Sequence, residues 1–526
     1  MLSKDISSLL ENLKRHHSLP QEKTPETLND SSAIGTNAIT RRAGTWYEKI
    51  RNLLDYQEDH AVKISVVRRI LRRKLVFSET NGMGNALLGE LARGGYLSGK
   101  ENSVTTANKI DRVIEKWNAV GNGNSAGAEK NSWGKFLGFA TAEVYRIVFP
   151  SLSGDLSADT FAEYIAPRIS FAPPIKSEDT SAEILTASRR SLLGTTDTEL
   201  SYMLWLKHFP EWKNDNLEIT NSVRDKARKV VTQIERQIKN PLGWIIARRI
   251  KNEAIYFSLI KEIIDKYGLD AENIFGNEKL LEETVREMAE EKYLASNKRA
   301  RESGGRAVFY VFATKMFFAL LIELPYDLFI IRSVDAVALG ANILFHPFFL
   351  FLTTKNLKCG GKKNTEAIIA GVKKVTALET KNEPIIRVKT AREKNAFEIV
   401  LLCLYALLFL LSFGVIIAVL NVFNFNPASI AVFIFFLALV TYFSFRIRHH
   451  AMKWKVETED EGIFTLLWDL FTLPIARFGR RLSITFSSIN VFIFIMDILI
   501  EAPFKMLLGV FDAFVSFLRE KKEEIR

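Results

Sequence analysis

The pattern of hydrophobic and polar positions changes character near Arg306. Before that point, apolar residues recur every three or four positions among charged residues, which is the period of amphipathic helices. Beyond it, apolar residues form long runs, and most of the 38 phenylalanines lie there. We predict an all-α protein, in which a multi-helix cytoplasmic N-terminal domain precedes a polytopic α-helical membrane domain.

The strongest membrane signal lies in residues 397–445. The first run, Ile399–Leu420, carries no charge and is long enough as a helix to cross a hydrocarbon layer about 30 Å thick. The second run, Ala428–Phe445, is also uncharged and lies near the lower length limit of a span. A soluble helix rarely stays apolar on every face over such a length. The sequence therefore predicts a helical hairpin through a bilayer, with its turn at Asn421–Pro427.

The preceding apolar stretch, residues 306–354, is predicted to form another membrane hairpin, but it contains ionisable residues. Such groups at membrane depth cost about 2.5–3.5 kcal/mol each, so they tend to face protein or water. Lys315, Glu323 and Asp327 are candidates to line an ion or proton path, beside a helix break at Pro325. The structural alternative is that Lys315 reaches the interface and the acids mark the hairpin turn. The full set of candidate intramembrane polar residues is Lys315, Glu323, Asp327, Asp335, His346 and Glu501.

Residues 446–518 are predicted to form interfacial and membrane helices. Ile463–Ala476 is apolar but short, so we interpret it as an interfacial or half-inserted helix. Ile500–Phe504 resembles Ile322–Tyr326, which is why Glu501 joins the candidates. The similarity indicates either a repeated broken-helix unit or a coincidence of apolar composition.

A basic loop, residues 355–396, separates the two predicted hairpins. Lys355–Lys394 holds eleven Lys/Arg and four Asp/Glu. Its net charge of +7 is more than half of the formal net charge of the chain, +11. Positive flanks stay on the cytoplasmic side, so both termini, including the charged tail 519–526, are predicted to be cytoplasmic. Within the loop, Ala367–Leu378 is predicted to be a helix that lies on an anionic leaflet. The candidate contacts to anionic lipid headgroups are Lys362, Lys363, Lys373 and Lys374.

The N-terminal half divides into a predicted disordered tail, residues 1–42, and a helical cytoplasmic domain, residues 43–305. No run of alternating β-branched residues is found there, so no strand is predicted. The predicted helices are Thr45–Phe77, Thr105–Val120, Trp133–Val148, Thr160–Ile169, Ser181–Leu193, Thr198–Phe209, Ile219–Ile238, Leu242–Tyr267 and Glu278–Arg301. In Leu242–Tyr267 the buried face is assigned to Ile245, Ile246, Ile250, Ala254, Phe257 and Ile264.

Candidate chemistry is sparse in this sequence. The spacings of a P-loop, a zinc-protease helix, paired cysteine motifs and a serine nucleophile elbow are all missing. The seven histidines are scattered, and the two cysteines, Cys359 and Cys403, lie in the basic loop and in a predicted span. That cysteine usage argues against a disulfide framework and fits a reducing compartment. We therefore predict no enzyme activity, no cofactor and no metal, and the motifs indicate no known family.

Three functions remain open at this point. The leading hypothesis is a non-enzymatic scaffold or recruitment platform at the cytoplasmic face of a membrane, with the bilayer, its anionic headgroups and an unidentified protein as partners. The alternative is a transporter or channel that uses Lys315, Glu323 and Asp327. A third is RNA association through the basic stretch Arg68–Lys74, but we favour a solvated face near a helix C-terminus, because no aromatic residues alternate with these arginines.

Overall fold

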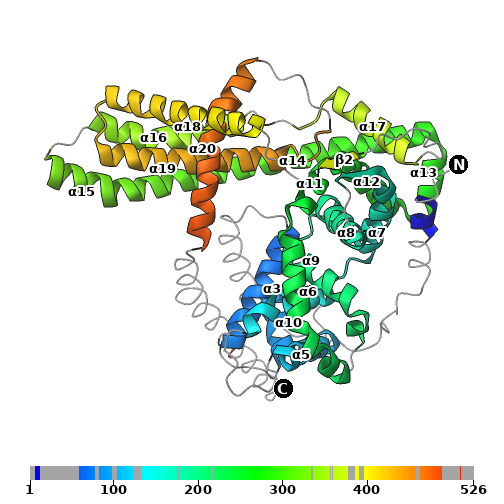
Figure 1. Ribbon diagram of the computed structural model, residues 1–526. Coiled ribbons are helices and arrows are strands. Elements are labelled where there is room, and N and C mark those ends of the chain that lie inside the picture. Colours follow the sequence, from blue (N-terminus) through cyan, green and yellow to red (C-terminus); the bar gives the residue numbers. More distant parts are fainter. Residues whose placement is uncertain are drawn as a thin grey trace, which may run out of the picture. The chain divides into compact units, whose positions relative to one another are not determined.

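The computed structural model (Figure 1) describes residues 6–11, 59–76, 82–97, 104–121, 132–173, 177–214, 217–332, 336–355, 357, 359–376, 386–389, 396–456, 463–488, 510 and 514. Helices make up nearly all of this part, which confirms the all-α prediction. The chain divides into two compact units. Unit 1 comprises Met1–Glu278, Gly371–Ala391 and Ile500–Arg526, and unit 2 comprises Lys279–Ala370 and Arg392–Leu499.

The helices of unit 1 follow the predicted amphipathic pattern closely. Their bounds are α3 (Asp59–Val76), α4 (Met83–Arg93), α5 (Val104–Gly121), α6 (Ser132–Val148), α7 (Leu152–Ile165), α8 (Ser177–Leu193), α9 (Asp197–His208), α10 (Leu217–Lys239), α11 (Pro241–Arg249), α12 (Lys251–Tyr267) and α13 (Ala271–Gly276). The short helices α4 and α13 were not predicted. The predicted tail lies largely outside the described residues, apart from a helical turn at residues 6–11.

Two predicted helices of unit 1 are wrong in detail. The helix predicted at Thr160–Ile169 begins earlier, at Leu152, and ends at Ile165, because Pro167 follows in a 3-10 turn. The helix predicted at Leu242–Tyr267 is two helices, since the backbone leaves helical geometry at Ile250. The buried face is nevertheless as predicted at Ile246, Ile250, Ala254, Phe257 and Ile264, whereas Ile245, predicted to be buried, is 41% exposed.

The core of unit 1 is built around Trp117, whose side chain is fully buried. Its ring centroid lies 4.6 Å from that of Trp212 and 5.0 Å from that of Trp205. The buried carboxylate of Glu143 accepts hydrogen bonds from the indole nitrogens of Trp117, at 2.7 Å, and Trp212, at 3.0 Å. Lys116 Nζ lies 3.3 Å from the same carboxylate, so the polar groups at the centre of this core have partners.

A two-stranded parallel sheet corrects the prediction that the chain holds no strand. Strand β1 (Ile169–Ala172) pairs with β2 (Ile386–Lys389), in a register that places Ile169 opposite Ile386. The strands are too short to give an alternating sequence signal, which is why they were missed. The pairing brings part of the predicted basic loop into unit 1.

The second unit is built from longer and more apolar helices. Its elements are α14 (Glu278–Phe318), the π-helical segment η5 (Ala319–Glu323), α15 (Leu324–Tyr326), the π-helical segment η6 (Asp327–Ile331), α16 (Ala336–Lys355), α18 (Ala396–Val422), α19 (Pro427–Ala451) and α20 (Ile463–Ser488). Helix α17 (Lys362–Thr376) has residues in each unit. Figure 1 shows α16, α18 and α19 running alongside one another, whereas α20 crosses them.

Three helices among the described residues are long and apolar enough to cross a membrane. They lie within Glu278–Ile331, Ile399–Val422 and Pro427–Ala451. In the most apolar window of Ile399–Val422 only 6% of the residues are buried, and Leu402 and Leu410 are 67% and 69% exposed. A soluble surface rarely carries an apolar patch of this extent, so these helices indicate association with a membrane.

Candidate functional site

A buried ion pair lies at the centre of unit 2, between Lys315 near the end of α14 and Glu323 at the end of η5. Lys315 Nζ lies 2.7 Å from Glu323 Oε1, and the side chains are both completely buried. The ammonium also lies 4.8 Å from the centre of the Phe436 ring, on α19. The pair neutralises both charges, and the aromatic face adds a cation–π contact to the cation.

Asn342, on α16, extends this pair into a network. Its Nδ2 donates a 2.6 Å hydrogen bond to Glu323 Oε2, so the two carboxylate oxygens have different donors. The Oδ1 of Asn342 is buried and accepts no hydrogen bond from any described residue. A buried amide oxygen without a donor is uncommon in proteins, because leaving it unpaired costs free energy.

His346 continues the network to α19. Its Nδ1 lies 3.0 Å from the carbonyl oxygen of Asn342, and its Nε2 lies 3.0 Å from that of Phe433. A neutral imidazole carries one N–H and donates to only one of these oxygens, whereas an imidazolium donates to both. The arrangement therefore ties α16 to α19 and offers two acceptors to a protonated ring.

Asp327 belongs to a separate contact, although it lies one helical turn after Glu323. Its Oδ1 accepts a 2.7 Å hydrogen bond from Asn426 Nδ2, while Asn426 Oδ1 caps α19 by accepting from the Ser429 N–H at 2.8 Å. Asp327 is buried and so is Glu323, as expected for residues on one helix face. The two acids therefore link the α14–η6 stretch to different helices. Glu323 contacts Asn342 of α16, and Asp327 contacts Asn426 at the start of α19.

The backbone around these acids is irregular for a reason that the sequence predicted. Pro325 has no N–H, so the α-helical bond to the carbonyl of Leu321 cannot form. The π-helical segments η5 and η6 flank the single turn α15 that holds this proline. π-helical turns are frequent at functional sites and at strained positions of helices. The stretch ends at Arg332, which adopts left-handed geometry with φ 59°.

The remaining predicted site residues lie elsewhere. Asp335 and Glu501 lie outside the described residues. Lys362, Lys363, Lys373 and Lys374 lie on α17, and Lys373 Nζ pairs with Glu278 Oε1 at 2.8 Å. The apolar face of α17, with Ile368, Ile369, Val372 and Val375, is buried within the protein. The lipid contacts of these lysines stay a prediction.

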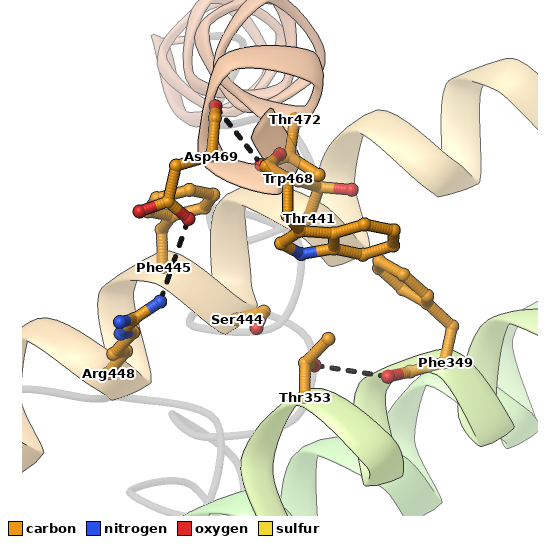
Figure 2. Close-up of a pocket in the computed structure, with 9 residues that line it drawn as sticks. All are labelled: Phe349, Thr353, Thr441, Ser444, Phe445, Arg448, Trp468, Asp469 and Thr472. Carbon is orange, nitrogen blue, oxygen red and sulfur yellow. Dashed lines mark hydrogen bonds and ion pairs between the residues drawn. The ribbon is translucent and has the colours of Figure 1, made fainter. Parts of the chain in front are cut away.

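A small cavity of about 120 Å³ lies between α16, α19 and α20 (Figure 2). Phe349, Phe445 and Trp468 contribute aromatic rings to its wall, and Arg448 Nη1 lies 3.7 Å from Asp469 Oδ1 at one side. The hydroxyls of its threonines donate to carbonyls four residues earlier in their own helices; they are Thr353, Thr441 and Thr472. The cavity therefore offers aromatic surface and one loose ion pair.

Unit 1 contains a larger cavity, of about 260 Å³, whose wall includes several charged side chains that the sequence did not reveal as neighbours. Asp155 accepts hydrogen bonds from both Arg146 and Arg189 in its wall, and His60 Nε2 lies 2.8 Å from Glu199 Oε1. Burial alone would raise the pKa of Asp155, but the hydrogen bonds and charges of Arg146 and Arg189 outweigh it and lower that pKa. These side chains come from α3, α6, α7, α8 and α9, so no local motif could indicate them.

The basic stretch on α3 is partly used inside unit 1. Arg73 forms hydrogen bonds with both carboxylate oxygens of Glu90, on α4. Arg68 and Arg72 are exposed, as expected for a solvated helix face. RNA association through Arg68–Lys74 stays a prediction.

Asn342, Asn426 and Phe433 are members of the unit 2 site that the sequence did not single out. Within the described part of the chain, no group of three or more His, Cys, Asp or Glu side chains is arranged to hold a metal ion. Comparison of the chain with protein-family models, curated proteins and solved structures finds no match.

Proposed function

We propose that this is a multi-pass membrane protein whose helical N-terminal unit acts as a non-enzymatic platform at the cytoplasmic face. The observation that carries the membrane part is the apolar, almost wholly exposed surface of α18. Exposing these apolar side chains to water costs free energy, and this cost disappears when lipid surrounds them instead. Helix α18 and helix α19 then form the hairpin, with the turn at Phe423–Asn426 on the far side.

Helix α20 packs across the proposed hairpin, because Gly479 lies against Ala438, near the midpoint of α19, and Ser412 of α18 donates to the carbonyl of Phe471. It runs across α18 and α19, and it exposes Leu467, Trp468 and Leu470. Arg477 lies over the Tyr405 ring of α18 with its guanidinium carbon 4.9 Å from the ring centre. Tryptophan and arginine side chains combine an apolar part with a polar end, so from this position they can extend toward the boundary between lipid and water.

The network around Lys315 supports an anchoring role for the membrane helices. Lys315 and Glu323 have protein partners, and the hydrogen bonds of Asn342 and His346 link η5, α16 and α19. Buried polar groups with protein partners specify how helices pack in a bilayer. In the proposed platform, the network would hold the membrane helices together as a rigid anchor for unit 1.

Membrane insertion is tested by cysteine accessibility in the full chain. We would replace Cys359 and Cys403 by Ser and place single cysteines at Phe423, in the turn, and at exposed Lys453. With sealed cells or spheroplasts, a membrane-impermeant maleimide should label position 423 directly and position 453 only after permeabilisation. Equal labelling of both positions before permeabilisation would refute the topology.

The platform role is tested by photo-crosslinking inside cells. A photoreactive amino acid at exposed positions of unit 1, such as Glu235 or Thr232, should give discrete protein adducts. The same amino acid at Leu410 of α18 should give lipid adducts instead. A unit 1 that yields no protein adduct from several exposed positions would contradict the platform.

The transporter or channel is the second candidate, and one observation favours it. Asn342 Oδ1 is buried beside an ion pair without a hydrogen-bond donor, and His346 faces two carbonyl oxygens. Polar atoms of this kind at membrane depth often mark an ion or proton path. Proteoliposomes that contain the full chain should then show proton or cation flux, and the Glu323→Gln/Asp327→Asn variant should lose it. A chain without flux in any gradient supports the platform alone.

A further inference from the structure

Helix α11 presents an exposed face that combines apolar and basic side chains. Trp244 is 55% exposed and Ile245 is 41% exposed, although both are large and apolar. Arg248 and Arg249, one turn further along, are exposed as well and have no ion-pair partner among the residues that the structure describes. Residues four apart share a helix face, so these four side chains form one surface, which we call the α11 face.

The side of α11 opposite the α11 face is fixed by contacts with the rest of unit 1. Asn240 Oδ1 caps the helix by accepting from the Leu242 N–H at 3.1 Å, and Asn240 Nδ2 donates to Glu183 Oε1 at 2.8 Å. Gly243 lies so close to α8 that a Cβ there would come within 2.9 Å of Glu183 Oε2. The exposed side is therefore fixed by close packing on the opposite side.

Trp244 itself is also fixed in place. The guanidinium carbon of Arg190 lies 4.4 Å from the centre of the Trp244 ring, and Arg190 Nη2 donates to Asp197 Oδ1 at 2.7 Å. A stacked guanidinium holds an indole in one orientation while leaving its other side free. Trp244 thus remains half exposed in a defined position, which costs little further entropy when a partner covers it.

The chemistry of the α11 face matches the surface of a bilayer. Indole rings favour the boundary between headgroups and acyl chains, and exposed arginines attract anionic headgroups. Each basic side chain near such a surface strengthens the attraction about fivefold. An aliphatic and an aromatic side chain next to two arginines is the combination that an interfacial helix uses.

The chain connectivity brings this face within reach of a membrane. Helix α11 packs against β2, and only residues 390–395 separate β2 from the start of α18. An extended chain of that length spans at most about 25 Å. A unit 1 that is tethered so closely to a spanning helix meets the leaflet surface at a high local concentration.

We propose that the α11 face docks unit 1 onto the anionic cytoplasmic leaflet, with Trp244 and Ile245 at the headgroup boundary and Arg248 and Arg249 on lipid phosphates and carboxylates. This inference rests on the proposed membrane insertion of α18. The docked face would keep unit 1 in one orientation at the membrane while its remaining surface stays free for partners.

The test uses the full chain, with Cys359 and Cys403 replaced by Ser, in nanodiscs of phosphatidylcholine alone or mixed with phosphatidylserine. A fluorophore on Ile245→Cys reports the α11 face, one on Leu410→Cys reports α18, and one on exposed Glu235→Cys is the matched control. Spin-labelled lipid should quench position 410 in both lipids and position 245 mainly with phosphatidylserine. Position 235 should stay unquenched throughout.

The Arg248→Gln/Arg249→Gln variant should lose more than half of the quenching at position 245 and none at position 410, and high salt should act in the same way. If position 410 is quenched but position 245 is not, docking is refuted and the spanning helix stands. If position 410 is not quenched, the proposed membrane insertion itself fails. Quenching at position 245 that is equal in both lipids and in the arginine variant would also overturn the proposal, because the arginines would then contribute nothing.

Discussion

Lys315 and Glu323 form a 2.7 Å ion pair although eight positions separate them along one helical stretch. In an α-helix eight residues rise about 12 Å, which is further than most side-chain pairs reach. The pair forms because a long lysine and a glutamate extend toward each other across the π-helical segment η5. It therefore braces the stretch of helix where Pro325 interrupts the regular bonding.

Removal of one partner of this pair should destabilise unit 2. Glu323→Gln leaves the buried ammonium of Lys315 without its counter-charge, which typically costs about 3–5 kcal/mol. The apparent melting temperature of the full chain in detergent should fall clearly. Glu278→Gln is the matched control, because the Glu278 side chain is 77% exposed and its loss should leave the melting temperature unchanged.

A compensating variant separates the charge effect from a packing effect. Lys315→Met combined with Glu323→Gln removes both charges and keeps an acceptor for Asn342 Nδ2. It should regain most of the stability lost in Glu323→Gln, because no unpaired charge remains. A double variant that is less stable than Glu323→Gln would show that the charge pair is not the source of the effect.

The core of unit 1 should depend on Glu143 in a similar way. Glu143→Gln keeps an acceptor oxygen but removes the charge beside Lys116, and it places an amide N–H₂ among indole donors. We expect a loss of about 3 kcal/mol, by the same reasoning about unpaired buried groups. Chemical denaturation followed by tryptophan fluorescence measures it, since Trp117 and Trp212 contact this residue. Glu235→Gln on the exposed side of α10 should leave the transition in place.

Acid should destabilise unit 1 through Asp155. The arginines hold the pKa of this carboxyl below its usual value of 3.8 in the folded protein. Its stabilising contribution is therefore present at neutral pH and is lost as the pH falls below that value, through the folded pKa. Asp155→Asn should be less stable than the original at neutral pH and should lose less stability on acidification. Melting temperatures recorded from about pH 2 to 7 check this, and parallel curves for the two chains would contradict it.

Helices α19 and α20 should separate when Gly479 acquires a side chain. A Cβ at Gly479 would lie 1.9 Å from the carbonyl oxygen of Ala438, so Gly479→Ala cannot be accommodated without movement of the backbone. Gly414→Ala, on α18, is the control, because nothing lies within 4 Å of the added carbon. A disulfide between cysteines placed on α19 and α20 should form more slowly in Gly479→Ala than in Gly414→Ala. Equal rates in both variants would mean that the close approach is not needed.

Much of the local structure of this chain was predictable from sequence. Thr196 caps α9 with a complete capping box, and Asn240 and Pro241 start α11, as their residue types indicate. The period of apolar residues placed α5, α6 and α10 within one or two residues of their observed ends. These signals are local, so a single sequence carries them.

The features that were missed depend on residues far apart in sequence. The pairing of β1 with β2 and the cavity around Asp155 bring together segments that share no short-range pattern. The same holds for the unit 2 site, where the sequence singled out Lys315, Glu323, Asp327 and His346 but not the partners that fix them. Asn342 and Asn426 are ordinary polar residues in the sequence, and only the packing of helices makes them specific partners.

The pairing of Ile169 with Ile386 has a consequence for the order of events during synthesis. Helices α14 and α16 lie between the two strands in the chain, so they leave the ribosome before β2 does. The first unit therefore has one strand without its partner until the chain has been synthesised as far as β2. The sheet of unit 1 can form only after α14 and α16 have been synthesised, so the N-terminal unit depends on a strand that follows much of unit 2 in the chain.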